Sequence, residues 1–420
     1  MSQCGQTCST AADLPGLSPP QRALLVLGVM VLVAVGKSML TRVSILSTQH
    51  VEIVSNATNA SASGGGGEHA RISYTGIAFS ALSCASTVLC AIVTFILEPG
   101  ALGTPEASAM PSLLVITLFS SIDLGCTNAA IARLAAPLQQ VLAALNPIFT
   151  ITLESLLGCH LKHPMLYAST VTLTAGAALV GYAFTQERRL EYQTMRGVAL
   201  MLTAVFSSAV KYVLLRKLSV RTRQSVGTIS FVFWVEMLAF LALSTVALAN
   251  GEFDTLVRSL TSAADPGALS VAIFISATLG GVRFLSEVYA LRFVAAIDVS
   301  AAKSLASVLF VLLALTLPSS AIDADAPQFA HIRFDDPSNP YRLACLVAGL
   351  AIVAASITTY WVVQRRLGPR GLIVRRYSGS CAARLGSLLG DDAHEGSDVA
   401  RAGATDLDSG LRLRRNAHST

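Results

Sequence analysis

Three charged side chains lie inside long apolar runs, and they give this sequence its clearest capacity for chemistry. Asp123, Glu236 and Lys303 are about 18, 15 and 10 Å along the axes of the helices that these runs would form. A charge at the centre of a bilayer costs about 2.5–3.5 kcal/mol on insertion scales, so each one calls for a partner or a function. A buried ammonium can bind an anion, and a buried carboxylate can neutralise a cation or carry a proton.

Lys303 is the first candidate for binding an anionic solute, and the alternative is a structural ion pair with Glu236 or Asp123. These two carboxylates fit the roles of counter-charge, proton-linked group and substrate contact equally well. Arg283 and Glu287 are four residues apart, a spacing at which helical side chains pair. That pair is interpreted either as a gate on the cytoplasmic side or as a helix end that neutralises its own charge.

Five further polar or helix-bending residues belong to the candidate site. Lys37 and Lys211 lie near the ends of their runs, where extending the ammonium to the lipid headgroups is the default interpretation and substrate binding is the alternative. Gln140 and Asn146 share a helix and can hydrogen-bond a polar solute or a neighbouring helix. Pro147 should bend that helix near its centre and free a carbonyl, as expected for a hinge that lines a cavity.

The composition indicates the elements that position these residues. Of 420 residues, 53% are hydrophobic and 13% are charged, against roughly 25% charged in a soluble domain. The apolar residues form runs of about 20, enough to cross a hydrocarbon core about 30 Å thick as helices that satisfy their own backbone. We therefore predict an all-α membrane protein whose ten transmembrane helices cover residues 22–39, 74–97, 111–131, 136–157, 164–184, 197–215, 226–249, 268–291, 296–317 and 341–363.

The loops predict the orientation of these helices. The net charge of +5 comes from short basic clusters between the runs, which fits the positive-inside rule better than nucleic-acid binding. Both termini are then cytoplasmic, and the Gly-rich loop 42–73 is lumenal. That loop contains two N-glycosylation acceptors, Asn56-Ala-Thr58 and Asn59-Ala-Ser61, whose use would place it in the secretory pathway. A cytoplasmic tail 1–21 and a disordered cytoplasmic tail 364–420 complete the predicted organisation.

A weak internal repeat relates the two halves. Sliding the chain by 160 residues lays 129–136 on 289–296 with three identities in eight positions. The shift pairs the third and fourth runs with the eighth and ninth, as expected if five helices had been duplicated. Because five is odd, the repeats 22–184 and 197–363 would be inverted, an arrangement that secondary transporters use to alternate access.

Several functional classes fit poorly. All seven His fall outside the apolar runs, and the motifs of hydrolases, zinc proteases and phosphate-binding loops are absent from the sequence. An enzyme is therefore not expected, nor is a cofactor or metal. A channel would more naturally show a re-entrant filter or a ring of like charges.

Several motifs resemble the triose-phosphate and nucleotide-sugar transporter family of the drug/metabolite transporter superfamily. Asp123-x-Gly125-x-x-Asn128, followed by Gln140 and Pro147-Ile-Phe-Thr, resembles that family's third and fourth helices. The later motifs similar to it are Ser286-Glu287 and Ala302-Lys303, together with Lys211 in the sixth helix and Lys37 in the first. The likeness covers about residues 22–365. It is closest to the branch related to GDP-fucose transporters.

The resemblance implies an antiporter that exchanges an anionic sugar derivative for a nucleoside monophosphate or phosphate. Substrate contacts are then expected from Lys303, Lys37, Lys211, Gln140 and Asn128. Two departures from the family pattern weaken the case for a small phosphate as the substrate. Ser304 stands where plastid phosphate translocators have an Arg, and Ala143 stands where many members have a Lys.

The expected function is nucleotide-sugar exchange in the Golgi or endoplasmic-reticulum membrane. The expected partners are an anionic small molecule and the lipid bilayer. Whether the protein also forms a homodimer is left open. A transporter of a smaller phosphorylated or neutral metabolite, proton-coupled through Asp123 or Glu236, is the alternative. A non-transporting membrane scaffold that uses the cytoplasmic tail is a more remote one.

Overall fold

The structure is a computed structural model, and it describes fifteen stretches of the chain. These are residues 21–22, 24–41, 44, 75–98, 103–105, 107–131, 133–134, 136–157, 160–183, 192–221, 228–263, 265–291, 294–316, 340–371 and 373–376. The predicted glycosylation acceptors Asn56 and Asn59 lie outside the described residues.

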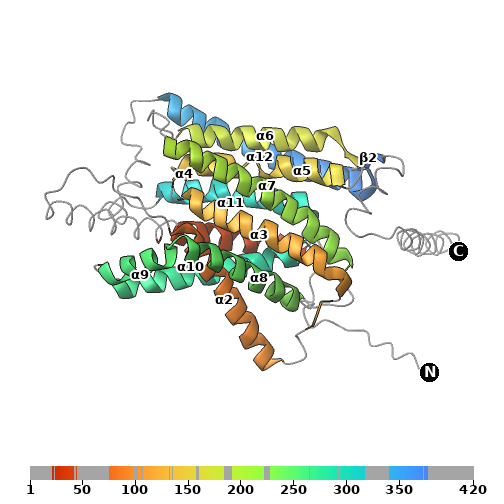
Figure 1. Ribbon diagram of the computed structural model, residues 1–420. Helices are drawn as coiled ribbons and strands as arrows, with labels where there is room; N and C mark the ends of the chain where they lie inside the picture. Colours follow the sequence, from red (N-terminus) through yellow and green to blue (C-terminus); the bar gives the residue numbers. More distant parts are fainter. Residues whose placement is uncertain are drawn as a thin grey trace, which may run out of the picture.

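The described chain forms a bundle of helices, with α6 and α12 on one side and α2, α8, α9 and α10 on the other (Figure 1). Helices α3, α7 and α11 lie between these two groups. The helical elements are the segment Leu24–Thr41, α2 (Gly76–Leu97), the short 3-10 helix η2 (Ala107–Ala109), α3 (Met110–Ile131), α4 (Ala136–Ala143), α5 (Asn146–Leu157), α6 (Pro164–Ala183), α7 (Tyr192–Arg221), α8 (Thr228–Ala249), α9 (Glu252–Ser262), α10 (Pro266–Ala290), α11 (Ala296–Thr316) and α12 (Pro340–Gly371).

Eight helical spans within the described residues are long and apolar enough to cross a membrane. They are Leu24–Thr41, Gly76–Leu97, Met110–Ile131, Leu138–Leu157, Met195–Lys217, Thr228–Ala249, Pro266–Ala290 and Leu343–Val363. A shorter apolar helix, Pro164–Val180, accompanies them. The predicted all-α membrane architecture is therefore confirmed at this level, and the chain has the length and composition of a multi-pass membrane protein.

The end of the last helix differs from the prediction. Helix α12 continues to Gly371, past the predicted end of the span at 363, and a short strand β2 (Ile373–Arg376) follows it. β2 pairs antiparallel with β1 (His160–Lys162), the segment between α5 and α6. Residues 364–371 are thus helix and residues 373–376 strand, although we predicted them as part of a disordered tail. Backbone pairing with β1 gives this polar segment partners that its composition does not reveal.

The fourth span is broken, as Pro147 predicts. Helix α4 ends at Ala143, Ala144 and Leu145 form a turn, and α5 begins at Asn146. The Ile148 N–H donates to the Leu145 carbonyl at 3.1 Å, and the Thr174 hydroxyl from α6 donates to the Ala144 carbonyl at 3.0 Å. A neighbouring helix therefore satisfies the carbonyl that the break exposes, which makes the interruption tolerable inside a membrane.

Glycines allow the closest helix contacts. A Cβ added at Gly176 of α6 would lie 2.9 Å from the Gly349 carbonyl oxygen of α12, and a Cβ at Gly349 would lie 2.8 Å from the Gly176 carbonyl. On α10, a Cβ at Gly280 would lie 1.9 Å from the Ser83 hydroxyl of α2. Small residues of this kind bring helix backbones together where the hydrophobic effect cannot drive association.

The short helix α9 fastens the start of α2. Glu252 Oε2 accepts hydrogen bonds from the backbone N–H groups of Ile77 and Ala78 at 2.8 and 3.0 Å. A carboxylate at this position caps a helix N-terminus and interacts favourably with its dipole. Burial raises the pKa of the Glu252 carboxyl above its ordinary value, and the two backbone N–H groups oppose that rise.

Candidate functional site

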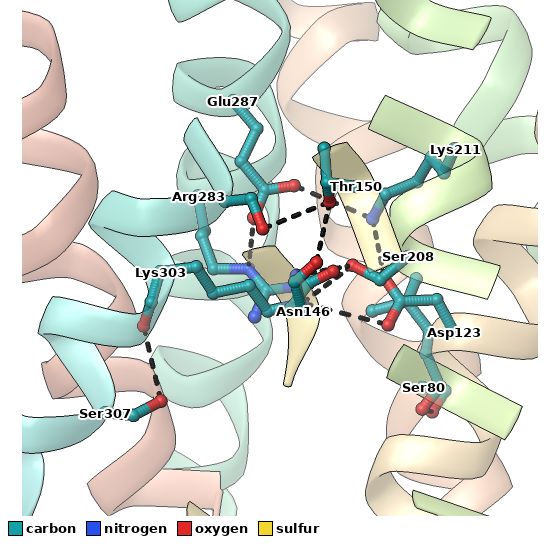
Figure 2. A network of polar contacts seen from close by, with 12 residues as sticks. Ser80, Asp123, Asn146, Thr150, Ser208, Lys211, Arg283, Glu287, Lys303 and Ser307 are labelled. Carbon is teal, nitrogen blue, oxygen red and sulfur yellow. Dashed lines mark hydrogen bonds and ion pairs between the residues drawn. The ribbon is translucent and has the colours of Figure 1, made fainter. Parts of the chain in front are cut away.

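Five charged side chains from four helices meet inside the bundle (Figure 2). Asp123 comes from α3, Lys211 from α7, Arg283 and Glu287 from α10, and Lys303 from α11. Residues far apart in the sequence therefore form one charged network inside the bundle. The network contains Asp123 and Lys303, two of the three deep charges that the sequence singled out.

Lys211 is the most enclosed cation of this network. Its ammonium lies 2.6 Å from Asp123 Oδ2 and 3.6 Å from Glu287 Oε2, and the side chain is 1% exposed. The nitrogen also lies over the rings of Tyr212 and Phe284, at 5.1 and 5.6 Å from their centroids. The default interpretation that Lys211 extends to the headgroups is wrong, because two carboxylates and two aromatic faces hold the ammonium inside the bundle.

Lys37 is also buried, with 6% of the residue exposed. Its ammonium packs against α10, and a Cβ added at Gly280 would lie 3.3 Å from it. The expectation that Lys37 reaches the headgroups is therefore wrong as well. Neither Lys37 nor Lys211 lines the central cavity described below.

Lys303 is placed differently from these two lysines. Its side chain is 21% exposed, and its ammonium donates to the Ser208 hydroxyl at 2.9 Å. The nearest Asp123 oxygen is 3.9 Å away, and the Tyr212 ring centroid is 5.6 Å away. Asp123 thus contacts both lysines, but it holds Lys211 closely and Lys303 only loosely.

Arg283 and Glu287 form the pair that their spacing predicts. Arg283 Nε lies 3.3 Å from Glu287 Oε1, and Glu287 Oε2 faces Lys211. The arginine is 13% exposed and the glutamate 2% exposed. The pair is therefore part of the central network. It is not an isolated pair that only neutralises the charge at the end of its own helix.

A cavity of about 60 Å³ opens beside the network. Lys303, Arg283 and Asp123 supply its charged lining, and Gln140 and Asn146 supply amides. The other lining residues are Ala34, Ser38, Thr127, Gln139, Ala143, Met201, Val205, Ala306 and Ser307. Ala143 lies in this wall, so a lysine at that position would have added a second ammonium to the cavity.

The broken fourth span supplies the hydrogen-bonding side of the site (Figure 2). Asn146 begins α5, and its Nδ2 lies 3.5 Å from the Ser208 hydroxyl, while its buried Oδ1 accepts no hydrogen bond from the described residues. One turn later, Thr150 donates to Ser300 of α11 at 3.1 Å. The break at Ala144–Leu145 is what places these polar groups at the level of the charged network.

Two predicted site residues lie elsewhere. Asn128 is buried between α3 and α2, where its Nδ2 donates to the Ser80 hydroxyl at 2.8 Å, so it joins two helices and does not line the cavity. Glu236 of α8 is 2% exposed, lies in an electrostatic cluster with Cys84, Lys37 and Lys211, and is also outside the cavity lining. The alternative ion pair between Lys303 and Glu236 does not form.

Ser208 is a site residue that sequence reasoning missed. It accepts hydrogen bonds from Lys303 and Asn146 and therefore connects α7 with α11 and α5. Ser207 and Ser208 stand one helical turn before Lys211, on a helix that is otherwise strongly apolar. That spacing was a usable signal, since residues three or four apart share a helix face.

Comparison with protein-family models gives no match, and no curated protein matches the sequence. Among solved structures, one described only as "Crystal structure of protein" is similar to the chain, with a TM-score of 0.48 and 12% sequence identity. The similarity covers 79% of this chain and 99% of the other. A likeness of this size does not bear on function.

Proposed function

We propose that the protein is a secondary active transporter that exchanges a nucleotide sugar for a nucleoside monophosphate. The observation that carries this proposal is the position of Lys303 in the wall of a polar cavity inside an apolar bundle. Arg283 shares that wall, so two cations face the space that a substrate would occupy. Phosphate groups favour such a pair, because ammonium and guanidinium groups donate charge-assisted hydrogen bonds to them.

The contacts of Lys303 suggest how an anion would be held. The ammonium donates to the Ser208 hydroxyl and lies 3.9 Å from Asp123 Oδ1. A phosphate oxygen can replace this loose contact without breaking the shorter bond between Asp123 and Lys211. The Asn146 amide and Gln140, in the same wall, provide hydrogen bonds for the uncharged part of the substrate.

The way the helices pair supports two inverted halves and alternating access. The eight apolar spans together with α6 and α11 give the ten helices of the proposal. If a two-fold axis relates inverted five-helix halves, the helices nearest to that axis contact their own counterparts, and the second, fourth and fifth helices of the two halves form such pairs. These pairs are α2 with α8, α4 and α5 with α11, and α6 with α12, and each pair is in contact.

The size of the cavity bears on the choice of substrate. A cavity of about 60 Å³ has room for a few water molecules, whereas pockets for drug-sized ligands measure about 300–1,000 Å³. A nucleotide sugar would therefore require another conformation in which the two halves separate. The break between α4 and α5 and the cavity-facing end of Leu24–Thr41 are the elements we assign to this opening.

A second candidate is a transporter for a smaller phosphorylated metabolite, and the small cavity favours it. The two cations of the wall would serve either substrate. Proton coupling through Asp123 belongs to this alternative. Uptake that follows an imposed pH gradient and ignores nucleotides would select it over nucleotide-sugar exchange, whereas a scaffold would show no uptake of either kind.

We assign the protein to the Golgi or endoplasmic-reticulum membrane, with both termini in the cytoplasm. The basic clusters between the spans and the two acceptor sequences at Asn56 and Asn59 support this assignment. The anionic substrate would then enter the lumen while the nucleoside monophosphate leaves it.

The decisive experiment is counterflow in proteoliposomes. Vesicles containing the purified protein are loaded with a nucleoside monophosphate and supplied with a panel of labelled nucleotide sugars. We expect uptake of at least one sugar only when the vesicles are preloaded, and its loss in Lys303→Ala. Val29→Phe, a substitution on a lipid-facing position, serves as control. No exchange with any nucleotide sugar would reject the proposal.

A further inference from the structure

A second hollow lies on the outer side of the helix that carries Lys303. It measures about 430 Å³ and lies between Leu24–Thr41, α6, α11 and α12. We call it the lateral groove. Its lining residues are Leu24, Leu27, Gly28, Val31, Leu32, Ser169, Thr170, Leu173, Asp298, Ala301, Ala302, Leu305, Ser356, Ile357, Tyr360 and Trp361.

Small residues on facing helices create this hollow. Gly28 lies on one wall, and Ala301 and Ala302 lie on the opposite wall. A Cβ added at Gly28 would meet no atom within 4 Å, so the space in front of this glycine is open. The glycines at the contact of α6 and α12 behave differently, because a Cβ there would collide with backbone atoms.

The polar groups in the groove wall are bonded within the protein. Ser169 and Thr170 donate to the Leu166 carbonyl at 2.9 and 3.1 Å, and Ser356 donates to the Ile352 carbonyl at 2.7 Å. At one end, Asp298 accepts hydrogen bonds from the Ala295 backbone N–H and the Tyr360 hydroxyl. The wall therefore presents mainly hydrocarbon to an occupant, which suits an apolar ligand.

The groove opens where the protein meets lipid. Leu24, Leu32 and Trp361 form part of its rim and are 61%, 72% and 50% exposed, although they belong to helices that are long and apolar enough to cross a membrane. Exposed apolar side chains in such spans face acyl chains. The occupant must then come from the bilayer.

The length of the groove matches one leaflet. From Leu24 to Leu32 a helix rises about 12 Å, and from Asp298 to Leu305 it rises about 10 Å, at 1.5 Å per residue. Half of a hydrocarbon core about 30 Å thick is about 15 Å. The Asp298 end lies at the start of α11. If α11 crosses the bilayer, a polar end group is tolerated there, and the rest of the groove would run toward the centre of the membrane.

We propose that the lateral groove binds one acyl chain of a membrane phospholipid. The chain enters beside Asp298 and Tyr360 and fills the space between Gly28 and Ala302. Helix α11 then separates two sites of opposite character, because Lys303, Ala306 and Ser307 face the polar cavity while Ala301, Ala302 and Leu305 face the acyl chain. This binding site does not depend on which solute the central cavity accepts.

Photo-crosslinking tests the proposal directly. The full chain is reconstituted into phosphatidylcholine vesicles that contain a fraction of phosphatidylcholine with a diazirine in its acyl chain, and labelled peptides are mapped by mass spectrometry. We expect the peptides around Ala302 and Ile357 to be labelled several-fold more than the lipid-facing part of α2 around Val93, which is 55% exposed. Gly28→Phe should abolish this excess and leave the labelling of α2 unchanged.

Val29→Phe is the matched control, because Val29 is 44% exposed on the same helix and lies outside the groove lining. It should leave the labelling of the groove intact. Equal labelling of the groove and α2 in the wild-type protein, or labelling of the groove that survives Gly28→Phe, would overturn the proposal, since either result describes ordinary boundary lipid.

A stability measurement covers the case in which Gly28→Phe folds poorly. Added phosphatidylcholine should raise the Tm of the detergent-purified wild-type protein, because a ligand that binds only the folded state stabilises it. The rise should be smaller in the milder variant Gly28→Leu than in Val29→Leu. Equal rises in the two variants would count against an acyl site in the groove.

Discussion

Three lysines inside the bundle share one chemistry but lie in three different surroundings. Lys211 is enclosed by Asp123 and Glu287, Lys37 packs against Gly280, and Lys303 faces a cavity. A cation that already has two carboxylates within 4 Å has little affinity to offer a substrate. Burial therefore separates Lys37 and Lys211, which are enclosed, from Lys303, which faces the cavity.

Replacing Lys211 by Ala should destabilise the protein far more than replacing Lys303 by Ala. The first change leaves Asp123, which is 3% exposed, without its closest cation and leaves Glu287, which is 2% exposed, with Arg283 as its ionic partner, and breaking a buried pair costs about 3–5 kcal/mol. The second removes a partly exposed cation with one looser ionic contact. Thermal unfolding of the two variants in the same detergent measures this difference. Equal losses of stability would contradict the division between the lysines.

The sequence predicted which charged residues belong to the site better than it predicted which residues each of them contacts. The depth of Asp123 and Lys303 in their runs and the four-residue spacing of Arg283 and Glu287 were visible in the sequence, and all four residues meet in the structure. The burial of Lys211 was not predictable, because distance from a helix end says nothing about which helices pack around it. The separation of Asn128 from the cavity depends on the same packing.

At the scale of single elements, α9 has a role that the apolar pattern did not predict. It is amphipathic, spans 11 residues and is too short to cross a membrane, so a search for long apolar runs passes over it. Its first residue, Glu252, caps α2 from 174 positions away in the chain. The contact connects the two halves of the protein at one end of the bundle.

Glu252 should give the stability of the protein a measurable dependence on pH. Burial raises its pKa, so the folded state holds the proton more tightly than the unfolded chain. The stability that this linkage contributes is full below the ordinary pKa of a glutamate and is lost as pH rises through the raised value. The Tm of the wild-type protein relative to Glu252→Gln should therefore be highest in acid and fall toward neutral pH. Parallel curves for the two proteins would exclude this linkage.

The contact of α6 with α12 should tolerate no added side chain. Gly176→Val would place a branched group where even a Cβ lies 2.9 Å from the Gly349 carbonyl oxygen, and overpacking of this kind costs about 1–3 kcal/mol. Gly36→Ala, whose Cβ would meet only Leu279 Cδ1 at 3.8 Å, is the control and should not lower the Tm. Thermal unfolding of both variants decides the matter. A Gly176→Val protein as stable as the control would show that the two helices can separate freely.

The helix boundaries illustrate what a hydropathy pattern can and cannot locate. The predicted span 74–97 matches α2 closely, and Pro147 marked the break between α4 and α5. Helix α7, however, runs from Tyr192 to Arg221, beyond both ends of the predicted span 197–215. Hydropathy reports where a helix meets hydrocarbon, whereas the helix itself continues through good helix formers such as Arg and Lys.

At the scale of the whole molecule, the lateral groove bears on the orientation of the chain. Leu24, near the start of the first described helix, and Trp361, near the end of the apolar span Leu343–Val363, both line it, so these two span ends lie at the same end of the bundle. Two ends lie on the same side of a membrane when the chain crosses the membrane an even number of times between them. The loop between Leu24–Thr41 and α2 would then lie on the opposite side of the membrane.

We expect both termini to face the cytoplasm and the loop 42–73 to be lumenal. Epitope tags at both ends should be digested by protease added to sealed microsomes, and a tag placed in the loop should be protected. Treatment with an endoglycosidase should increase the mobility of the wild-type protein and leave the double variant Asn56→Gln, Asn59→Gln unchanged. Tags at the two ends with opposite accessibility would reject this topology.

The inverted repeat could be proposed from the sequence only through a short match around 129–136 and 289–296. The contacts of α2 with α8 and of α6 with α12 add support that composition could not supply. These contacts depend on side chains and glycines spread over both halves of the chain, such as Gly176 and Gly349, whose partnership is invisible until the helices are packed.

The central network has an electrical consequence. With each side chain in its ordinary charge state, Lys211, Arg283 and Lys303 carry three positive charges, while Asp123 and Glu287 carry two negative charges, which leaves one positive charge in the network. If the unloaded site changed its exposure from one side of the membrane to the other, that charge would cross part of the membrane field. One elementary charge gains or loses about 2.3 kcal/mol per 100 mV. The membrane voltage would thus set how readily the unloaded protein changes its orientation, and a bound anion would change the size and sign of the charge that moves.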